Sequence, residues 1–454
     1  MKLSLKTVMI LGASALFGLG ALAQQPVPSN LTAIPQLPGP MVPGNPAEQL
    51  SQPIRTQFTS KIGFLDSDPA LGASYPRVVQ LQHFAKGRGH LLATFGRRGP
   101  LPIYRSTDNG ETWTFLASVP NLRGQPALYE LPVRMGDFPA GTVIAAGTGA
   151  PEQGSPRRTL EAAVSTDGGT SWQPLSVIST GGVGRYDAVN RAGLSIQNPV
   201  WEPFLYTDSQ GRLVAYISNE GHKEQGYSQL LEHKVSTDGG RTWGPAVFDV
   251  AIPDGLTRPG MAVVTKNAKG KYFMSYEVVG KPGVALEPRS NLTHFKTSDD
   301  GLNWGKVDDY GTFIQDRWRQ YANGTPYIVW SPYGGPNGTL LVTGRSILRY
   351  ELGRVGNGMM INRNNGEGLW HLIETPIVYN PVNDGYSQTM IPLGDGREIL
   401  QMVGVNNRIA YAKFLLPETL PEYPFPFGTV RVPMTPDSSI PPVPQPQGRG
   451  GRGQ

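Results

Sequence analysis

The stretch Ser165–Trp172 reads STDGGTSW, and nearly the same phrase occurs three more times in the chain. The other copies are STDNGETW at Ser106–Trp113, STDGGRTW at Ser236–Trp243 and TSDDGLNW at Thr297–Trp304. The aspartates at the third position follow one another at intervals of 59, 71 and 61 residues. Periods of this length, with short strands between turns, are typical of the blades of a β-propeller. The repeat therefore predicts one copy of the phrase in each of several blades.

The residue types of the phrase suit a tight turn between two strands. An Asp carboxylate can accept backbone N–H groups within such a turn, and Gly adopts conformations closed to other residues. The Trp supplies a large side chain that can pack between blades. A role in binding calcium or a ligand is the weaker interpretation, because a structural turn is needed in every blade and an active site only once.

A second repeat supports the propeller. Six segments begin near a proline or tyrosine, run apolar, turn on a Gly and return as a β-rich strand, which is the pattern of a hairpin. They begin at Tyr75, Gln125, Glu202, Arg258, Thr325 and Tyr386. A fifth, weaker copy of the phrase follows the fifth hairpin at Ile361–Trp370. About 60 residues per hairpin are enough for a four-stranded blade. We expect an all-β fold, a six-bladed β-propeller with four-stranded antiparallel blades, over residues 58–416.

The remaining segments read as flanks. Residues 1–23 resemble a secretory signal peptide, with Lys2 and Lys6 before an apolar run and Ala-Leu-Ala ending at Ala23. Residues 24–57 form a Pro-rich linker and residues 417–454 a Pro/Gly-rich tail, expected to be disordered in part. We expect a secreted or periplasmic monomer that is not held in a membrane after cleavage of the signal.

The composition of the chain excludes several classes of function. The chain has no cysteine, which excludes disulfides and thiol chemistry, and its net charge of +5 is small for 454 residues. Without a concentrated basic arm, a nucleic-acid partner is not expected. The six histidines show no zinc-ligand spacing. No metal and no cofactor are expected.

One mouth of the propeller should carry the site. The first strand of each blade begins there and the second strand returns there, so the hairpin starts form a ring with the ends of the second strands. Those ends are Arg97, Arg98, Asn219, Glu220, Glu277, Arg345 and Asn406. A purely structural ring would repeat one residue, as the turn phrase does. This ring varies, which favours a site.

Two carboxylates in the ring fit glycosidic chemistry. Glu202 opens the third hairpin in NPVWEPFLY, and Glu277 ends the next one in KYFMSYEVVG. A retaining glycosidase needs two carboxyl groups about 5–5.5 Å apart, one as nucleophile and one as proton donor. Arg258 would help to keep one of them ionised. The alternatives are a surface glutamate at a strand start for Glu202 and an ordinary strand-end glutamate for Glu277.

Several aromatic side chains are candidates for stacking on sugars, although for each one alone packing within a blade is the stronger interpretation. They are Trp201, Tyr206, Tyr227, Trp330 and Tyr333. At this mouth we expect Tyr75, Arg77, Gln125, Trp201, Asn219, Arg258 and Arg345 to bind substrate.

The chain resembles glycoside hydrolase family 93, the exo-α-1,5-L-arabinanases, within the sialidase-type propellers whose turn phrase is the Asp-box. The resemblance covers most of Phe64–Phe414 and is sharpest in WEPFLYTDSQGRLVAYIS, TRPGMAVV and KYFMSYE. It implies a retaining enzyme that releases arabinobiose from the non-reducing end of linear α-1,5-arabinan. It also implies Glu202 as nucleophile, Glu277 as acid/base and Tyr386, in DGYSQTM, as the assisting tyrosine.

Two other functions remain open at this stage. An exo-sialidase of the same fold would use an arginine triad, for which Arg77, Arg258 and Arg345 are candidates. However, FGRRGPLPIYRS lacks the aspartate expected of a sialidase proton donor. The third possibility is a carbohydrate-binding propeller without activity, because Asp-boxes also occur in propellers that are not enzymes.

Overall fold

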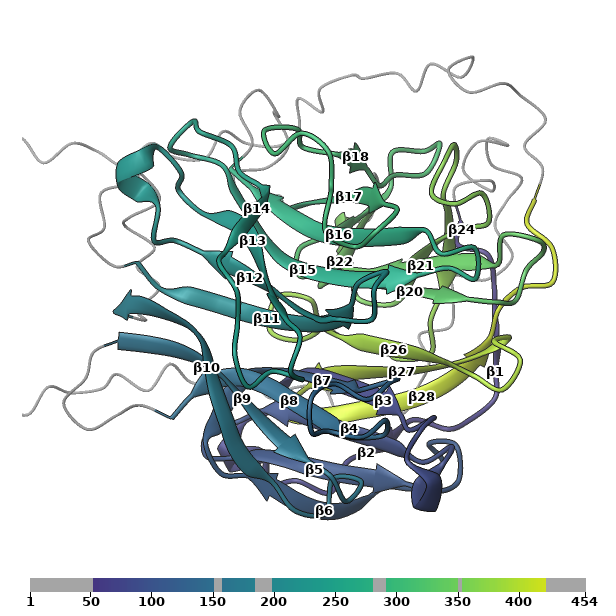
Figure 1. Ribbon diagram of the computed structural model, residues 1–454. Coiled ribbons are helices and arrows are strands. Elements are labelled where there is room, and N and C mark those ends of the chain that lie inside the picture. Colours follow the sequence, from purple (N-terminus) through teal and green to yellow (C-terminus); the bar gives the residue numbers. More distant parts are fainter. Residues whose placement is uncertain (1–51, 151–156, 184–197, 281–290, 350–352, 422–454) are drawn as a thin grey trace, which may run out of the picture. The chain divides into compact units, whose positions relative to one another are not determined.

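The computed structural model describes residues 52–421, except for residues 151–156, 184–197, 281–290 and 350–352 (Figure 1). The expected signal peptide and most of the expected linker and tail lie outside the described residues. Pairing begins slightly before the expected boundary at Phe58, because the N–H of Ile54 donates to Leu372 O at 2.8 Å. Within the described part of the chain, no helix is both long and apolar enough to cross a membrane.

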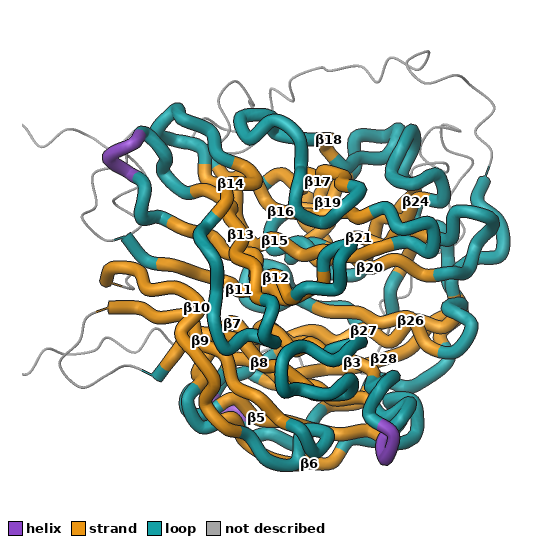
Figure 2. Tube along the Cα trace, viewed as in Figure 1, coloured by secondary structure: helices purple, strands orange, loops and turns teal. Residues whose placement is uncertain are grey.

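The described strands form six sheets, and Figure 2 shows how little helix accompanies them. The first three sheets contain β3 (Ser74–Gln80), β4 (Leu91–Gly96), β5 (Leu101–Ser106) and β6 (Thr114–Val119); β7 (Leu122–Glu130), β8 (Val143–Gly149), β9 (Arg157–Ser165) and β10 (Gln173–Val183); and β11 (Val200–Thr207), β12 (Leu213–Asn219), β13 (Leu230–Ser236) and β14 (Val247–Val250). Short 3₁₀ helices occur at Pro69–Leu71, Ala85–Gly87 and Lys223–Gln225.

The other three sheets are more elaborate. The fourth contains β15 (Arg258–Lys266), β16 (Tyr272–Val279), β17 (Leu292–Ser298) and β18 (Thr312–Phe313), extended by β19 (Tyr321–Asn323), β22 (Ser346–Arg349) and β23 (Gly353–Val355). The fifth contains β20 (Tyr327–Ser331), β21 (Thr339–Thr343), β24 (Gly358–Asn362) and β25 (His371–Glu374). The last contains β26 (Thr389–Leu393), β27 (Glu398–Val405) and β28 (Arg408–Leu415), and the early strands β1 (Gln57–Phe58) and β2 (Gly63–Phe64) pair with β28.

The first strands of the sheets contact one another in a closed order: β3, β7, β11, β15, β20, β26 and again β3. All pairings within the six sheets are antiparallel. An all-β propeller with four-stranded antiparallel blades, as both sequence repeats predict, is therefore confirmed. Pairing of β1 with β28 joins the start of the described chain to its last blade (Figure 1).

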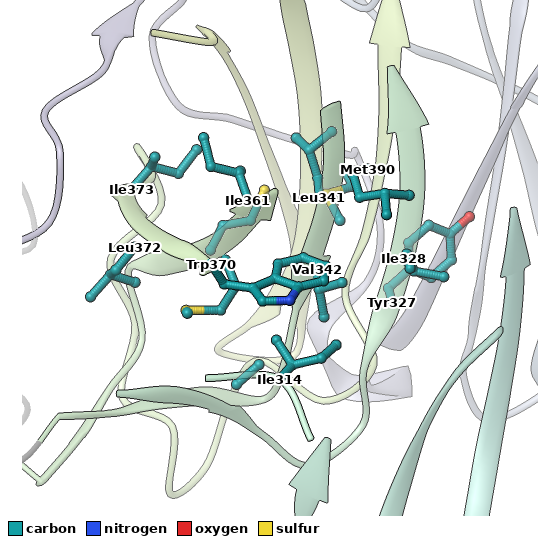
Figure 3. Packing of buried hydrophobic residues seen from close by; sticks show 14 of the residues in the cluster. Ile314, Tyr327, Ile328, Leu341, Val342, Ile361, Trp370, Leu372, Ile373 and Met390 are labelled. Carbon is teal, nitrogen blue, oxygen red and sulfur yellow. The ribbon is translucent and has the colours of Figure 1, made fainter. Parts of the chain in front are cut away.

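The core lies between neighbouring blades. A strand whose sheet is covered on both faces is buried at nearly every position, as β15 and β16 are. In one such cluster Trp370, 1% exposed, lies among Ile314, Val342 and Ile361, and its ring is 5.9 Å from that of Phe295 (Figure 3). Trp370 thereby joins the fifth sheet to the fourth.

The Asp-boxes are the turns between the third and fourth strands of their blades. In the copy at Ser165–Trp172, Asp167 accepts hydrogen bonds from the backbone of Ser171 at 2.9 Å and of Thr170 at 3.1 Å. The indole N–H of Trp172 donates to Gly169 O at 2.9 Å. The structural interpretation of the phrase is thus supported.

Two of the later copies depart from the pattern of the turn phrase. In the copy at Thr297–Trp304 the turn is one residue shorter, so Asp300 rather than Asp299 accepts the bonds of Leu302 and Asn303. Asp299 instead forms an ion pair with Lys271 at 2.9 Å. The weak copy also forms its turn, with Asn362 accepting from the N–H groups of Asn364 and Gly366.

One backbone feature repeats at the mouth of every blade. The first strand of each blade is entered through a residue other than glycine with a positive φ: Tyr75, Gln125, Glu202, Met261, Thr325 and Ser387, with φ between 43° and 61°. Four of them coincide with a register shift in the hairpin. In two hairpins the residue with this conformation differs from the start expected from the sequence: Met261 takes the place of Arg258, and Ser387 the place of Tyr386.

Candidate active site

A cavity of about 420 Å³ lies at the mouth and brings together most of the residues expected to form the site. We call it the glutamate cavity. Its lining consists of Gln125, Trp201, Glu202, Gln229, Arg258, Glu277, Val279, Asn291, Arg345 and Tyr386. They come from the second, third and fourth sheets and from the segments that precede β13, β17, β22 and β26. Two carboxylates, two arginines and two aromatic rings thus share one enclosed space of the size usual for small-molecule sites.

Glu202 has few partners for its charged form. It sits at the bulge where β11 begins, with φ of 59°, and its carboxylate accepts one hydrogen bond from Ser218 Oγ at 2.9 Å. Burial, reinforced by the nearby Glu277 carboxylate, raises the pKa of Glu202 from 4.5 to about 7, although the Ser218 hydrogen bond and the charges of Arg158 and Arg258 oppose this shift. Near neutral pH this side chain is therefore protonated much of the time.

Glu277 is better provided for as an anion. Its Oε2 accepts the backbone N–H of Thr325 at 2.7 Å and the side-chain amide of Asn291 at 3.4 Å. Burial raises the pKa of Glu277 too, but these two donors and the charges of Arg258 and Arg345 oppose that effect. Donors aimed at a carboxylate stabilise its ionised form. The surroundings thus stabilise the carboxylate of Glu277 better than that of Glu202. Glu202 is therefore the better suited to carry a proton.

Trp201 is held in place from two directions. Its indole N–H donates to Glu220 Oε1 at 2.9 Å, and Glu220 also pairs with Arg258 at 2.8 Å and with Lys223 at 2.8 Å. The guanidinium of Arg158 lies 4.0 Å from the centre of the Trp201 ring. A ring fixed in this way is suited to serve as a platform for a sugar.

The other aromatic candidates for stacking lie elsewhere. Tyr206 packs on Tyr129, with ring centres 5.6 Å apart, and Tyr227 packs on Phe248 at 5.8 Å. Trp330 and Tyr333 belong to the hairpin of β20 and β21 and are packed against the core cluster around Trp370. None of these four lines the glutamate cavity.

Tyr75, Arg77 and Tyr386 form a stack beside the cavity. The Arg77 guanidinium lies 4.6 Å from the centre of the Tyr75 ring, which in turn is 5.7 Å from the Tyr386 ring. Arg77 is buried and donates to Ser387 O at 3.0 Å and to Ser387 Oγ at 2.9 Å. The expectation that Arg77 binds substrate is not supported, because its donors support the stack and it does not line the cavity.

Tyr75 and Asn219 also differ from expectation in position. Tyr75 lines an adjoining cavity, and its buried hydroxyl has no hydrogen-bond partner among the described residues. Asn219 is turned away from the glutamate cavity, where it donates to Glu232 Oε1 at 2.9 Å and accepts the N–H of Gly221 at 2.7 Å. Its expected role in substrate binding is therefore not supported by its contacts.

The sequence analysis missed three side chains at the site: Arg158, Gln229 and Asn291. Gln229 and Asn291 immediately precede β13 and β17, and Arg158 lies at the start of β9. All three therefore occur where the third strand of a blade leaves the mouth. Extending the ring to the starts of the third strands would have found them. Among the described residues, no group of three or more His, Asp or Glu side chains is arranged to hold a metal ion.

Comparison with known proteins was made on sequence and on structure. No protein-family model and no curated protein sequence matches the chain. Among solved structures, an α-L-arabinanase from Penicillium chrysogenum in complex with arabinobiose is 31% identical, with a TM-score of 0.66. The match covers 81% of this chain and 99% of the arabinanase.

A second similar enzyme is an α-L-arabinofuranosidase from Fusarium graminearum. Its complex with an iminosugar inhibitor is 26% identical, with a TM-score of 0.66, over 79% of this chain and 98% of that one. Its complex with arabinobiose, described as that of a family 93 enzyme, has a TM-score of 0.64. Because the arabinanase shares 31% identity over nearly its whole length, the chain belongs to glycoside hydrolase family 93 and is a glycosidase.

Proposed function

We propose that this protein is an exo-acting, retaining glycosidase that releases arabinobiose from the non-reducing end of α-1,5-L-arabinan. The observation that carries the proposal is the unequal pair of glutamates in one cavity, Glu202 and Glu277. Retaining hydrolysis requires one carboxyl group that holds a proton and one that is an anion. The complexes of the two similar enzymes with arabinobiose support a disaccharide as the product.

The electrostatics reverse the roles that the family resemblance implied for the two glutamates. Glu202, with its pKa raised to about 7, fits the acid/base. Glu277, which accepts two hydrogen bonds where Glu202 accepts one, fits the nucleophile. We therefore assign the attack on the sugar to Glu277 and the proton transfers to Glu202.

The reaction follows in two steps. In the first, a Glu277 oxygen attacks the anomeric carbon while the glycosidic C–O bond breaks, and Glu202 donates its proton to the leaving oxygen. In the second, the Glu202 carboxylate takes a proton from water as the water oxygen attacks the same carbon and Glu277 departs. Two inversions give net retention. Tyr386, at the rim, and Trp201 would position the sugar between the two carboxyl groups.

Digestion of linear α-1,5-arabinan by the purified protein tests the proposal. We expect a disaccharide to accumulate from the start of the reaction, and the Glu202→Gln and Glu277→Gln variants to lose about 10²-fold or more in kcat. A ladder of longer oligosaccharides would contradict exo action. Undiminished hydrolysis by both variants would contradict the assignment of the site.

A sialoside assayed in parallel tests the runner-up. A sialidase would hold the substrate carboxylate with converging arginines, but Arg77 is occupied with Ser387 outside the cavity that Arg258 and Arg345 line. We therefore expect no release of sialic acid. Binding of arabinan without turnover by the parent protein would instead favour the non-catalytic propeller.

The separate roles of the two glutamates have their own test. Glu202→Ala should still form the glycosyl intermediate from a substrate whose leaving group needs no proton, such as a dinitrophenyl arabinoside. Added azide should then accelerate turnover and give a product of retained configuration. Glu277→Ala with azide should give the inverted product. The opposite pattern would restore the roles implied by the family resemblance.

Three further features belong to the proposal. We infer six blades, one for each sheet, from the closed order of their first strands. The basic and apolar start of the sequence supports export to the periplasm or the medium. We also propose a monomer that needs no cofactor, because the two carboxyl groups supply the acid, the base and the nucleophile.

A further inference from the structure

A second cavity, of about 490 Å³, adjoins the glutamate cavity and shares Gln125 and Tyr386 with it. Three arginines line it: Arg97 and Arg98, which directly follow β4, and Arg123 in β7. We call it the arginine cavity. It lies at the same mouth, where the last, first and second sheets meet. A substrate that fills the glutamate cavity can therefore extend into it past Gln125 and Tyr386.

The three guanidinium groups have hydrogen-bonding capacity to spare. Arg97 donates from Nε to Pro100 O at 3.0 Å, and Arg98 donates from Nη2 to Ala70 O. Arg123 donates from Nη1 to Pro120 O at 2.6 Å and to Leu122 O at 3.0 Å. Each guanidinium offers five N–H donors. Most of these donors therefore have no protein acceptor within the described part of the chain.

Charge in the arginine cavity is not balanced by the protein. Within the described residues, none of the three arginines forms an ion pair with a carboxylate. Asp384 also lines the cavity, but its Oδ1 accepts the backbone N–H of Asn406 at 2.9 Å. Three positive side chains thus face one carboxylate. A neutral arabinan supplies no anion that would use this excess.

A carboxylate attached to a sugar fits these features. Arginine binds carboxylates through two parallel hydrogen bonds, and it does so more strongly than it binds neutral hydroxyl groups. The backbone carbonyl contacts hold the three side chains at the wall of the cavity, which limits the ordering needed on binding. The cavity volume lies within the range of about 300–1,000 Å³ usual for small ligands.

We propose that the arginine cavity is a subsite for a uronic acid residue carried by the polysaccharide substrate. The proposal rests on the proposed glycosidase function, which it deepens: the preferred substrate is an arabinan chain or branch next to a carboxylated sugar. Arg97, Arg98 and Arg123 bind the carboxylate, and Gln125 and Tyr386 mark the boundary with the reacting sugar.

Calorimetric titration with D-galacturonate, and with D-galactose as the matched neutral sugar, tests the subsite directly. We expect galacturonate to bind and galactose to bind at least about tenfold more weakly, because charge-assisted hydrogen bonds are the stronger kind. The Arg98→Gln/Arg123→Gln variant should lose about tenfold or more in galacturonate affinity. Arg241→Gln removes one positive charge on an Asp-box turn, at the opposite end of its blade, and should leave the affinity unchanged.

Equal binding of the two sugars, no binding of galacturonate, or an affinity unaffected by the double substitution would each overturn the proposal. Circular dichroism and the unfolding midpoint of each variant verify its folding. Arg97 is unchanged in the double variant and is held by a separate hydrogen bond to Pro100 O. The Arg97→Gln variant is therefore an independent test, and we expect it to weaken galacturonate binding as well.

Kinetics then separate this proposal from the proposed function. The readout is the ratio of kcat/KM on uronate-bearing arabino-oligosaccharides to kcat/KM on neutral ones. We expect a ratio above one in the parent that falls toward one in the double variant. Hydrolysis of neutral arabinan with no uronate preference would overturn the subsite alone. Galacturonate binding without any arabinan hydrolysis would keep the subsite and contradict the proposed function.

Discussion

Replacing Glu202 by Gln should abolish most activity and yet stabilise the folded protein at alkaline pH. Glu202 has a pKa of about 7 in the folded protein, against an ordinary value of 4.5. Between these values the folded state holds a proton that the unfolded state has released, so the stability of the parent falls as the pH rises through this window. The loss is complete above the folded pKa.

The magnitude follows from the same two values. At 1.36 kcal/mol per pH unit, the difference between 4.5 and about 7 corresponds to about 3 kcal/mol. This is an upper limit, because Glu202 is only half-buried at the cavity wall and water there screens its charge. Gln cannot ionise, so the Glu202→Gln variant escapes this cost. We expect it to gain up to about 3 kcal/mol at pH 8 and almost nothing at pH 4.

Urea unfolding followed by tryptophan fluorescence at pH 4, 6 and 8 measures this difference. The exposed Glu224, replaced by Gln, is the matched control and should show no such dependence. A gain that is equal at pH 4 and pH 8 would refute the reasoning, since it would mean that ionisation of Glu202 carries no cost. A loss of stability at pH 8 would refute it as well.

Three further predictions concern pH and folding. Activity should fall as the pH rises through about 7, and Arg158→Met should move this limb upward in the pH profile of kcat/KM, because Arg158 favours the ionised form of Glu202. Glu130 accepts the N–H groups of Gln82, His83 and Phe84, so Glu130→Gln should cost about 2–3 kcal/mol of unfolding free energy in urea, with kcat unchanged. Although partial burial opposes it, the hydrogen bonds of Ser171 and Ser165 hold the pKa of Asp167 below its ordinary value. Asp167→Ala should therefore destabilise the protein at pH 7 by about 1–2 kcal/mol, and by less below pH 4, in thermal unfolding.

Much of the architecture could be predicted because it is repeated. Each Asp-box fixes a turn, and each Gly-centred hairpin fixes two strands, so errors in one blade are corrected by the others. The exceptions were local. The shorter turn at Asp300 cannot be distinguished from its neighbour Asp299 by spacing alone, because either aspartate fits the phrase.

The glutamates could also be predicted, because symmetry places strand starts and strand ends at one mouth. Their roles could not. What distinguishes Glu277 from Glu202 is the N–H of Thr325 and the amide of Asn291, which come from a different blade and from an unremarkable position before β17. No local pattern reports which carboxylate will receive such donors.

Arg77 shows which part of a site the sequence does not determine. An arginine near the mouth of the first blade suggests a substrate contact, but the bulge at Tyr75 turns the strand so that the guanidinium reaches Ser387. The positive φ at these six positions is a tertiary feature, since residues as different as Met261 and Gln125 adopt it. Side-chain direction at a bulge cannot be obtained from alternation along a strand.

The anomeric configuration of the first product tests the central claim most directly, since it depends on both glutamates and on the proposed substrate. Proton NMR during digestion of linear α-1,5-arabinan records the anomeric form of the disaccharide before mutarotation equilibrates the two anomers. The account predicts arabinobiose that appears first as the α-anomer and is absent with Glu277→Gln. Arabinobiose that appears first as the β-anomer would contradict the two-step mechanism, and the absence of any disaccharide would contradict the proposed function.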